Sequence, residues 1–324
     1  LRAMTDTSAA AASTSAKPSV AILDVDLDEH ARRIRKQDRI ATIFLTVIVG
    51  FVLALLAALV IYILAQGLPE VLTPGFLTNS PLDRDNPGIS YELFDSFYML
   101  FVTLVISVPI SLGAAIFLVE YAPENWVTSA ASTAIETLSS LPSIVVGMFG
   151  SLFFVVYCGW GVSILSGAMA LTMFNIPILV RVIQQALQDV PRVQRDASLA
   201  MGLTRWETTR SVLLPAAMPA IVTGIVISAG RVFGEAAALL FTSGAAPARL
   251  NFGSLDITSL RNPWNIFRQA ETLAVHIYKL RMEPTPGNDA IAWGTAAVLI
   301  ICVLLFNVGA RMLGKHLAKK MTSE

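Results

Sequence analysis

Residues 196–202 read Asp-Ala-Ser-Leu-Ala-Met-Gly, and after nine further residues the chain continues as Val212-Leu213-Leu214-Pro215. This polar stretch lies between two long apolar runs. The small side chains of Ala197 and Ser198 allow another surface to approach closely, and Gly202 permits a backbone turn that is closed to other residues. Basic residues outnumber acidic ones around it: Arg181, Arg192, Arg195, Arg205 and Arg210 against Asp189, Asp196 and Glu207. Because basic loops stay on the cytoplasmic side of a membrane, we expect residues 181–215 to form a cytoplasmic loop.

The composition is that of an integral membrane protein. The 324 residues are 55% hydrophobic and only 14% charged, whereas a soluble domain carries about 25% charged residues. The net charge of zero gives no indication of a nucleic-acid partner. The two cysteines, Cys158 and Cys302, lie in or beside apolar runs, so the sequence supports neither a disulfide framework nor a cysteine metal site.

Six apolar stretches are near or above the roughly 20 residues that a helix needs to cross a bilayer. They are residues 40–65, 94–119, 134–157, 160–180, 215–241 and 290–311. The first stretch exceeds the core of a cleavable signal peptide, and we expect it to remain as a span. The sequence therefore predicts an all-α membrane protein with six transmembrane helices.

Charge and the number of spans together predict the topology. Residues 1–39 are polar, with an acidic patch and then a basic run, and we expect a largely disordered cytoplasmic segment there. The transmembrane domain would extend over residues 40–313, with 242–289 as a long outer loop and 314–324 as a basic cytoplasmic tail. Six spans return both termini to the cytoplasmic side of the cell membrane, in agreement with the basic residues at both ends.

The fifth stretch contains two charged residues, Arg231 and Glu235, spaced four apart. A charge at the centre of a bilayer costs about 2.5–3.5 kcal/mol on insertion scales, so it requires a compensating role. Gly230 and Gly234 allow a neighbouring helix to approach this face. One hypothesis places the two charges on a substrate path; the alternative is an ion pair that only holds helices together.

The third stretch contains Pro142, Ser143 and Gly147 near its middle. A proline within a helix frees a backbone carbonyl, and small residues allow another helix to pack closely. We expect a kinked span that serves as a packing surface. Asp95 and Glu136 are interpreted as acidic residues at the starts of spans, where the helix dipole favours them.

The stretch around Gly202 resembles the EAA-x3-G-x9-I-x-L-P signature of permease subunits of ATP-binding-cassette (ABC) importers. In that family the segment forms two short helices joined at the glycine, which dock into a cleft of the ATPase subunit. The resemblance implies a type I importer permease fold with a cytoplasmic coupling loop. The residues that carry it are Asp196, Ala197, Ser198, Gly202, Leu214 and Pro215.

Three further stretches are similar to the PstA family of phosphate permeases. Residues 231–242 resemble R-x2-G-E-T-x-P-L-L-F-T, residues 138–150 contain the run P-S-x-V-x-G-x-F-G, and residues 272–278 resemble T-L-P-V-x-I-Y. The resemblance implies that Arg231 and Glu235 lie on the phosphate path. The sequence departs from the family pattern at Ala236, Ala238 and Ala274, which replace Thr, Pro and Pro.

The same resemblance implies the partners. They are a PstC-like permease, two PstB-like ATPase subunits, an external PstS-like phosphate-binding protein and inorganic phosphate. The run 309–315 matches G-x4-G-K, but His316 follows instead of Ser or Thr, and a span precedes it. We therefore expect no cofactor and no enzymatic activity in this chain, with ATP and magnesium bound by the ATPase.

Other hypotheses remain open. The coupling loop is common to permeases for sulfate, molybdate and phosphonate, and a stand-alone secondary transporter is a rival from another class. The three histidines, His30, His276 and His316, lie in separate polar segments and are interpreted as surface residues.

Overall fold

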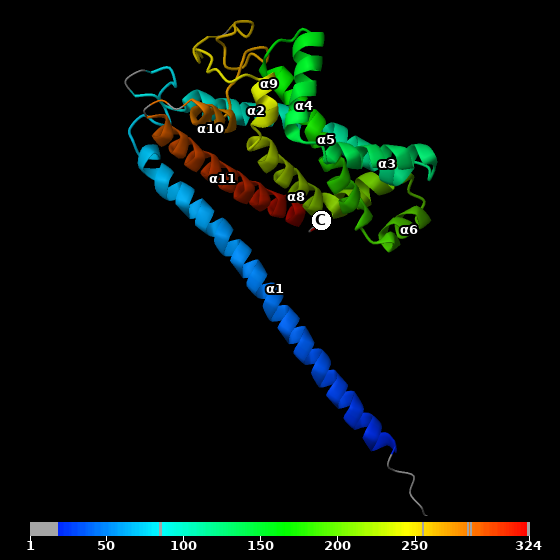
Figure 1. The fold of residues 1–324 in the computed structure, drawn as a ribbon. Coiled ribbons are helices and arrows are strands. Elements are labelled where there is room, and N and C mark those ends of the chain that lie inside the picture. Colours follow the sequence, from blue (N-terminus) through cyan, green and yellow to red (C-terminus); the bar gives the residue numbers. More distant parts are fainter. Residues whose placement is uncertain (1–18, 84–85, 255, 284, 286, 323–324) are drawn as a thin grey trace, which may run out of the picture. The chain divides into compact units, whose positions relative to one another are not determined.

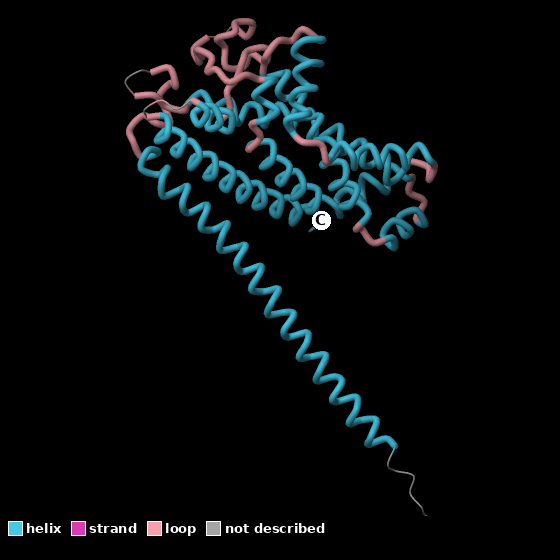
Figure 2. The backbone as a smooth tube through the Cα atoms, viewed as in Figure 1, coloured by secondary structure: helices cyan, strands magenta, loops and turns pink. Residues whose placement is uncertain are grey.

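The computed structural model describes residues 19–83, 86–254, 256–283, 285 and 287–322 (Figures 1 and 2). All regular structure within these residues is helical. The elements in chain order are α1 (Ser19–Val71), α2 (Ser90–Ile116), η1 (Phe117–Tyr121), α3 (Trp126–Ser139), α4 (Ser143–Gly150), η2 (Ser151–Tyr157), α5 (Ile164–Gln188), α6 (Arg192–Ala200), α7 (Arg205–Thr208), η3 (Thr209–Leu213), α8 (Leu214–Phe233), α9 (Ala237–Thr242), α10 (Leu273–Met282) and α11 (Asn288–Thr322). The η segments are π-helical turns.

The chain divides into two compact units, residues 1–61 and 62–324. The first unit contains most of helix α1, which begins at Ser19 rather than at the predicted start of the span at residue 40. From Ile34 onward the side chains of this unit are exposed and largely apolar. Residues 1–18, part of the predicted disordered segment, lie outside the described residues.

The second unit is a helical bundle built around α5. In the most apolar stretch of α5, 67% of the residues are buried inside the protein, so α5 is the central helix. Ser163 caps the helix by accepting a hydrogen bond from the backbone N–H of Ser166, and the helix ends shortly before Pro191. Helices α2, α8 and α3 pack against α5, and α11 packs against α8.

The bundle has two ends that its contacts define. At the long-loop end, Tyr91 at the start of α2 donates to the carbonyl of Leu250, and the backbone N–H of Ile164 at the start of α5 donates to Arg268. At the short-helix end, which contains α6 and α7, Arg195 pairs with Glu120 beyond the end of α2. Figure 2 shows the loop between α9 and α10 gathered at the long-loop end.

The predicted third span is bent. Its helical structure begins at Trp126 instead of residue 134, and α3 meets the α4–η2 helix at an angle of 102°. Pro142 lies at the bend, where its fixed φ and missing N–H end the α-helix. Glu136 therefore lies near the end of α3, and its interpretation as a helix-start residue is wrong; it pairs instead with Arg181 at 3.0 Å.

The bent segment still passes from one end of the bundle to the other. The pair between Glu136 and Arg181 places the carboxyl half of α3 beside the later part of α5. After η2, Ser163 is hydrogen-bonded to the carbonyl of Thr242 at the long-loop end. Five helices are long and apolar enough to cross a membrane, and the bent pair makes up to six within the described residues. The predicted number of spans thus includes a broken one.

The predicted fifth span, residues 215–241, is interrupted. Helix α8 ends at Phe233, Gly234 caps it, and a short helix α9 follows from Ala237. Arg231 and Glu235 consequently do not share one continuous helical face, because Glu235 lies in the break. This corrects the expectation that was based on a spacing of four residues.

Candidate functional site

The predicted coupling loop forms two short helices. Helix α6 is followed by Gly202, whose φ of 87° is left-handed and accessible to glycine at little cost. Helix α7 then begins with a capping box between Thr204 and Glu207. The local sequence thus supplies both the end of the first helix and the start of the second.

Ser198 holds these short helices together. Its side chain is buried, and its hydroxyl donates to the carbonyl of Arg195 at 2.8 Å and lies 3.1 Å from the hydroxyl of Thr208. Asp196 and Ala197, in contrast, are exposed. A small hydroxyl side chain at position 198 therefore has a structural use within the loop, whereas its neighbours face outward.

The loop exposes large apolar side chains among its charged ones. Four large hydrophobic side chains are exposed there at 40–78% of their surface: Val193, Leu199, Met201 and Trp206. Clustered exposed hydrophobic side chains beside polar ones are typical of a surface that another protein covers. The geometry of the loop suits a docking surface for a partner subunit.

The loop is joined to the bundle in two places. Helix α7 continues through η3 into α8, so that residues 205–233 form one helical span containing Leu214 and Pro215 in its interior. Arg195 of α6 pairs with the carboxylate of Glu120, which is 6% exposed. These two connections join the short helices directly to α8 and to the end of α2.

Arg231 lies in the last turn of α8, where the helix dipole favours a cation. Its guanidinium lies 4.0 Å from the centre of the Phe174 ring, a cation–π contact, and its side chain is exposed on the isolated chain. No ion pair joins it to Glu235 in the described part of the chain. Glu235 instead accepts a hydrogen bond from the backbone N–H of Ala238 at 3.3 Å, near the start of α9.

The predicted packing residues surround the two helix breaks. Pro142 precedes the first turn of α4, which begins at Ser143. Gly147 faces α9, where a Cβ would lie 2.6 Å from the Cα of Ala238, so only glycine allows this approach. Gly230 faces Asn307 of α11, whereas Gly234 has only its own helix within 4 Å.

Sequence reasoning missed a polar layer inside the bundle. Asn175 of α5 is fully buried and donates to the hydroxyl of Ser107 in α2 at 3.2 Å. It also accepts a hydrogen bond from Ser228 of α8. The signal available in the sequence was a lone asparagine in the apolar run of α5, next to Phe174, whose ring Arg231 contacts. The layer connects three spans immediately beside the Arg231 contact.

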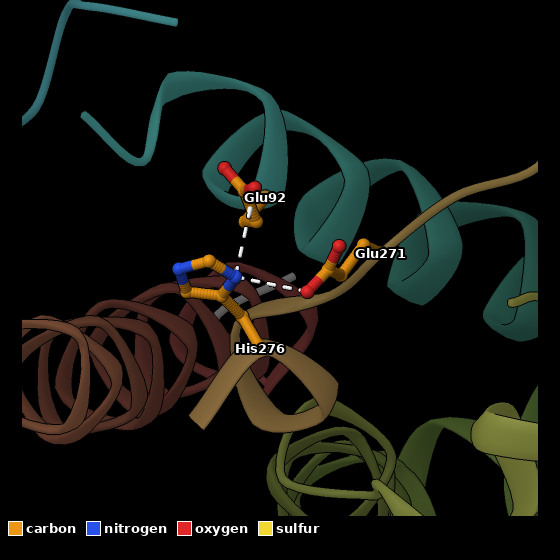
Figure 3. A group of neighbouring side chains, drawn as sticks. All are labelled: Glu92, Glu271 and His276. Carbon is orange, nitrogen blue, oxygen red and sulfur yellow. Dashed lines mark hydrogen bonds and ion pairs between the residues drawn. The ribbon is translucent and has the colours of Figure 1, made fainter. Parts of the chain in front are cut away.

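Two charged groups at the long-loop end were also missed. Asp95, interpreted as a helix-start residue, is buried and forms an ion pair with Arg268, which also donates to the carbonyls of Pro263 and Gln269. His276 is only 7% exposed, so its interpretation as a surface histidine is wrong. It lies beside Glu92 and Glu271 (Figure 3). Asp95 and Glu92 are each more than 170 positions from their partners in the long loop and α10, and no local pattern connects them.

The chain is similar to known membrane permeases. The family profile described as "Binding-protein-dependent transport system inner membrane component" matches residues 107–323. The probable ABC transporter permease protein YqgI of Bacillus subtilis is 47% identical, covering 88% of this chain and 98% of the relative. The phosphate transport system permease protein PstA of Xylella fastidiosa is 32% identical, covering 78% and 83%.

Solved structures show the same fold. The inward-facing MetNI methionine ABC transporter matches with a TM-score of 0.52 at 21% identity, covering 71% of this chain and 94% of the other. A bacterial alginate ABC transporter, in complex with an alginate-bound periplasmic protein, matches with a TM-score of 0.56 at 14% identity, covering 90% and 97%. The fold is that of a type I importer permease.

Proposed function

The chain belongs to the family of binding-protein-dependent transport system inner membrane components, and we propose that its particular role is to import inorganic phosphate. It is a multi-pass permease subunit of an ABC importer. In this proposal it forms one half of the translocation pathway, with a PstC-like permease as the other half.

The observation that supports an anionic substrate is the position of Arg231. This exposed cation belongs to a span that has no other charged residue from Leu214 to Phe233. A bare guanidinium facing lipid would be costly, so the face of α8 that bears it has to line protein or water in the assembled transporter. The planar fork of arginine donates two hydrogen bonds to oxygens of one phosphate.

Some of the relatives support phosphate as the anion. Proteins named phosphate transport system permease PstA align over most of this chain, at 32% identity in Xylella fastidiosa and 30% in Mycobacterium tuberculosis. The relative with 47% identity has a name that gives no substrate. The Arg231 and Glu235 positions match the PstA pattern, although Ala236 and Ala238 depart from it.

Glu235 is proposed to shape the site. Because its carboxylate accepts a hydrogen bond from Ala238, it stabilises the break between α8 and α9 beside Arg231. The free backbone at such a break provides polar groups within a span, as in other transporters with interrupted helices. This role replaces that of a simple counter-ion on the same helical face.

Transport in this proposal is powered by two PstB-like ATPase subunits that dock on α6 and α7. Their closure moves the short helices, and the continuous helix from Arg205 to Phe233 carries that movement to Arg231. A PstS-like binding protein would deliver phosphate at the long-loop end. Both termini would then be cytoplasmic.

Uptake competition tests the substrate. Cells that express the complete transporter should accumulate radiolabelled phosphate in an ATP-dependent manner, and excess sulfate, molybdate or phosphonate should not reduce the rate. Uptake of one of these anions in labelled form, with no phosphate uptake, would assign the permease to that anion. A chain that transports phosphate after purification without an ATPase would contradict the importer mechanism.

A further inference from the structure

Three buried side chains from two separate parts of the chain meet at the long-loop end. Glu92 lies in the first turn of α2, Glu271 immediately precedes the cap of α10, and His276 lies within α10. Their exposures are 0%, 1% and 7%. One ligand atom from each lies within 4.8 Å of the others.

The carboxylate of Glu92 has no hydrogen-bond partner. Both of its oxygens are buried and unpaired, although Glu271 is bonded to His276 and to Lys279. A buried carboxylate without a donor is unfavourable, because nothing replaces the water that it loses. A proton on this carboxyl group or a cation beside it would relieve the cost.

His276 cannot satisfy both carboxylates. Its Nδ1 lies 2.9 Å from the Oε1 of Glu271 and 3.7 Å from the Oε1 of Glu92, so the single proton of this nitrogen serves Glu271 (Figure 3). Lys279 contacts the other oxygen of Glu271 at 3.3 Å. Neither side chain donates a hydrogen bond to Glu92.

We propose that Glu92, Glu271 and His276 form a binding site for one Zn²⁺ or Mn²⁺ ion. One imidazole nitrogen and two carboxylates are ligands that these ions accept, whereas Mg²⁺ and Ca²⁺ prefer oxygen alone. Around a tetrahedral ion with bonds of about 2.1 Å, ligand atoms lie about 3.4 Å apart. The separations of 2.9 Å and 3.7 Å lie on either side of this value.

The surrounding structure positions the ligands. The hydroxyl of Ser96 donates to the carbonyl of Glu92 and accepts a hydrogen bond from the backbone N–H of Leu273, which fixes α10 against α2. Thr272 caps α10 one residue after Glu271. Ligands held on helices that are already joined need little reorganisation to bind an ion.

An ion has access to the site. His276 and Lys279 line a cavity of about 280 Å³ that Gly88, before α2, and Glu283, after α10, also border. The cavity reaches the site at His276 and extends to Glu283, whose acidic side chain is exposed. A bound ion would join α2 to α10 and stabilise the long-loop end, independently of which anion is transported.

Metal titration of the purified full-length chain tests the proposal. After removal of any affinity tag and treatment with chelator, ZnCl₂ and MnCl₂ are titrated separately by calorimetry. We expect about one high-affinity ion per chain for one of the two metals. Glu92→Gln and His276→Gln should each weaken this binding at least about tenfold, while Glu283→Gln, at the mouth of the same cavity, should bind as the wild type does.

The wild type alone provides a second measurement, which does not depend on variants that fold. Its thermal unfolding temperature in detergent should rise with the bound metal and fall again with chelator. No metal-dependent shift together with no calorimetric binding would overturn the proposal. Undiminished binding by the triple variant Glu92→Gln, Glu271→Gln and His276→Gln would overturn it as well.

Discussion

At the scale of the residue, the setting of Arg231 differs from the one that its spacing indicates. On an unbroken helix, a residue four positions away would share the face of Arg231. Glu235, however, lies beyond the end of α8 and accepts a hydrogen bond from Ala238 in α9. Arg231 contacts the ring of Phe174, and within the described residues its guanidinium donates no hydrogen bond. This arrangement favours a guanidinium that receives a ligand over one that only neutralises a neighbour.

Arg231→Gln should therefore reduce phosphate uptake while the complex still assembles. Hydrogen bonds to a charged group contribute about 1.5–3 kcal/mol, so a decrease of at least about tenfold is expected. Arg231→Lys should recover little, because an ammonium lacks the planar fork. Radiolabelled uptake and copurification of the ATPase measure the two effects.

The exposed Arg249 of the long loop provides a matched control. Arg249→Gln removes the same charge outside the bundle and should leave uptake near the wild-type rate. Near-normal uptake by the double variant Arg231→Gln with Glu235→Gln would show that Arg231 has no direct contact with phosphate.

At the scale of the element, local chemistry made some features predictable and not others. The two short helices around Gly202 follow from signals in neighbouring residues: a left-handed turn, a capping box and Pro191. The bend before Ser143 and the break after Phe233 do not interrupt the hydropathy, so apolar length alone predicted continuous spans. Pro142 indicated a possible kink, whereas Gly234 was interpreted as a packing residue, and the packing of α4 on α9 accompanies both breaks.

Replacement of Gly202 tests the coupling element. Gly202→Val forces a branched side chain into a left-handed backbone, at a cost of at least about 1–2 kcal/mol. Nothing lies within 4 Å of the added Cβ, so the effect should be a distorted turn rather than a clash. We expect a normally inserted protein in which ATP hydrolysis no longer drives uptake, measured in proteoliposomes that contain the whole complex.

Gly161→Val is the matched control, because Gly161 also has a positive φ, 67°, and open surroundings, but lies just before α5 at the long-loop end. It should cause similar strain without uncoupling. Normal coupling by the Gly202→Val complex would remove the α6–α7 loop from the proposed mechanism.

At the scale of the whole molecule, the sequence predicts the class and the approximate spans because hydropathy is a property of consecutive residues. It does not predict which distant polar residues meet. Asp95 and Arg268 are separated by 173 positions, and Asn175 and Ser107 by 68, so their pairing exists only after the helices have packed. The buried polar groups of the bundle were accordingly the part of the site that sequence reasoning missed.

Accessibility to an impermeant thiol reagent tests the proposed topology. In a background with Cys158→Ser and Cys302→Ser, Asn251→Cys lies in the exposed long loop and Glu124→Cys in the exposed turn before α3. Three segments separate these positions: the bent α3–α4–η2 segment, α5 and the helix ending in α8. If all three cross the membrane, the positions lie on opposite sides.

In intact cells we expect Asn251→Cys to react, and Glu124→Cys only after permeabilisation. Reaction of both positions in intact cells would show that the bent segment returns to its own side, whereas reaction of Glu124→Cys alone would invert the chain. Reaction of Asn251→Cys in intact cells places the α6–α7 loop on the cytoplasmic side, where ATP is present, because only the span that ends in α8 separates this loop from residue 251.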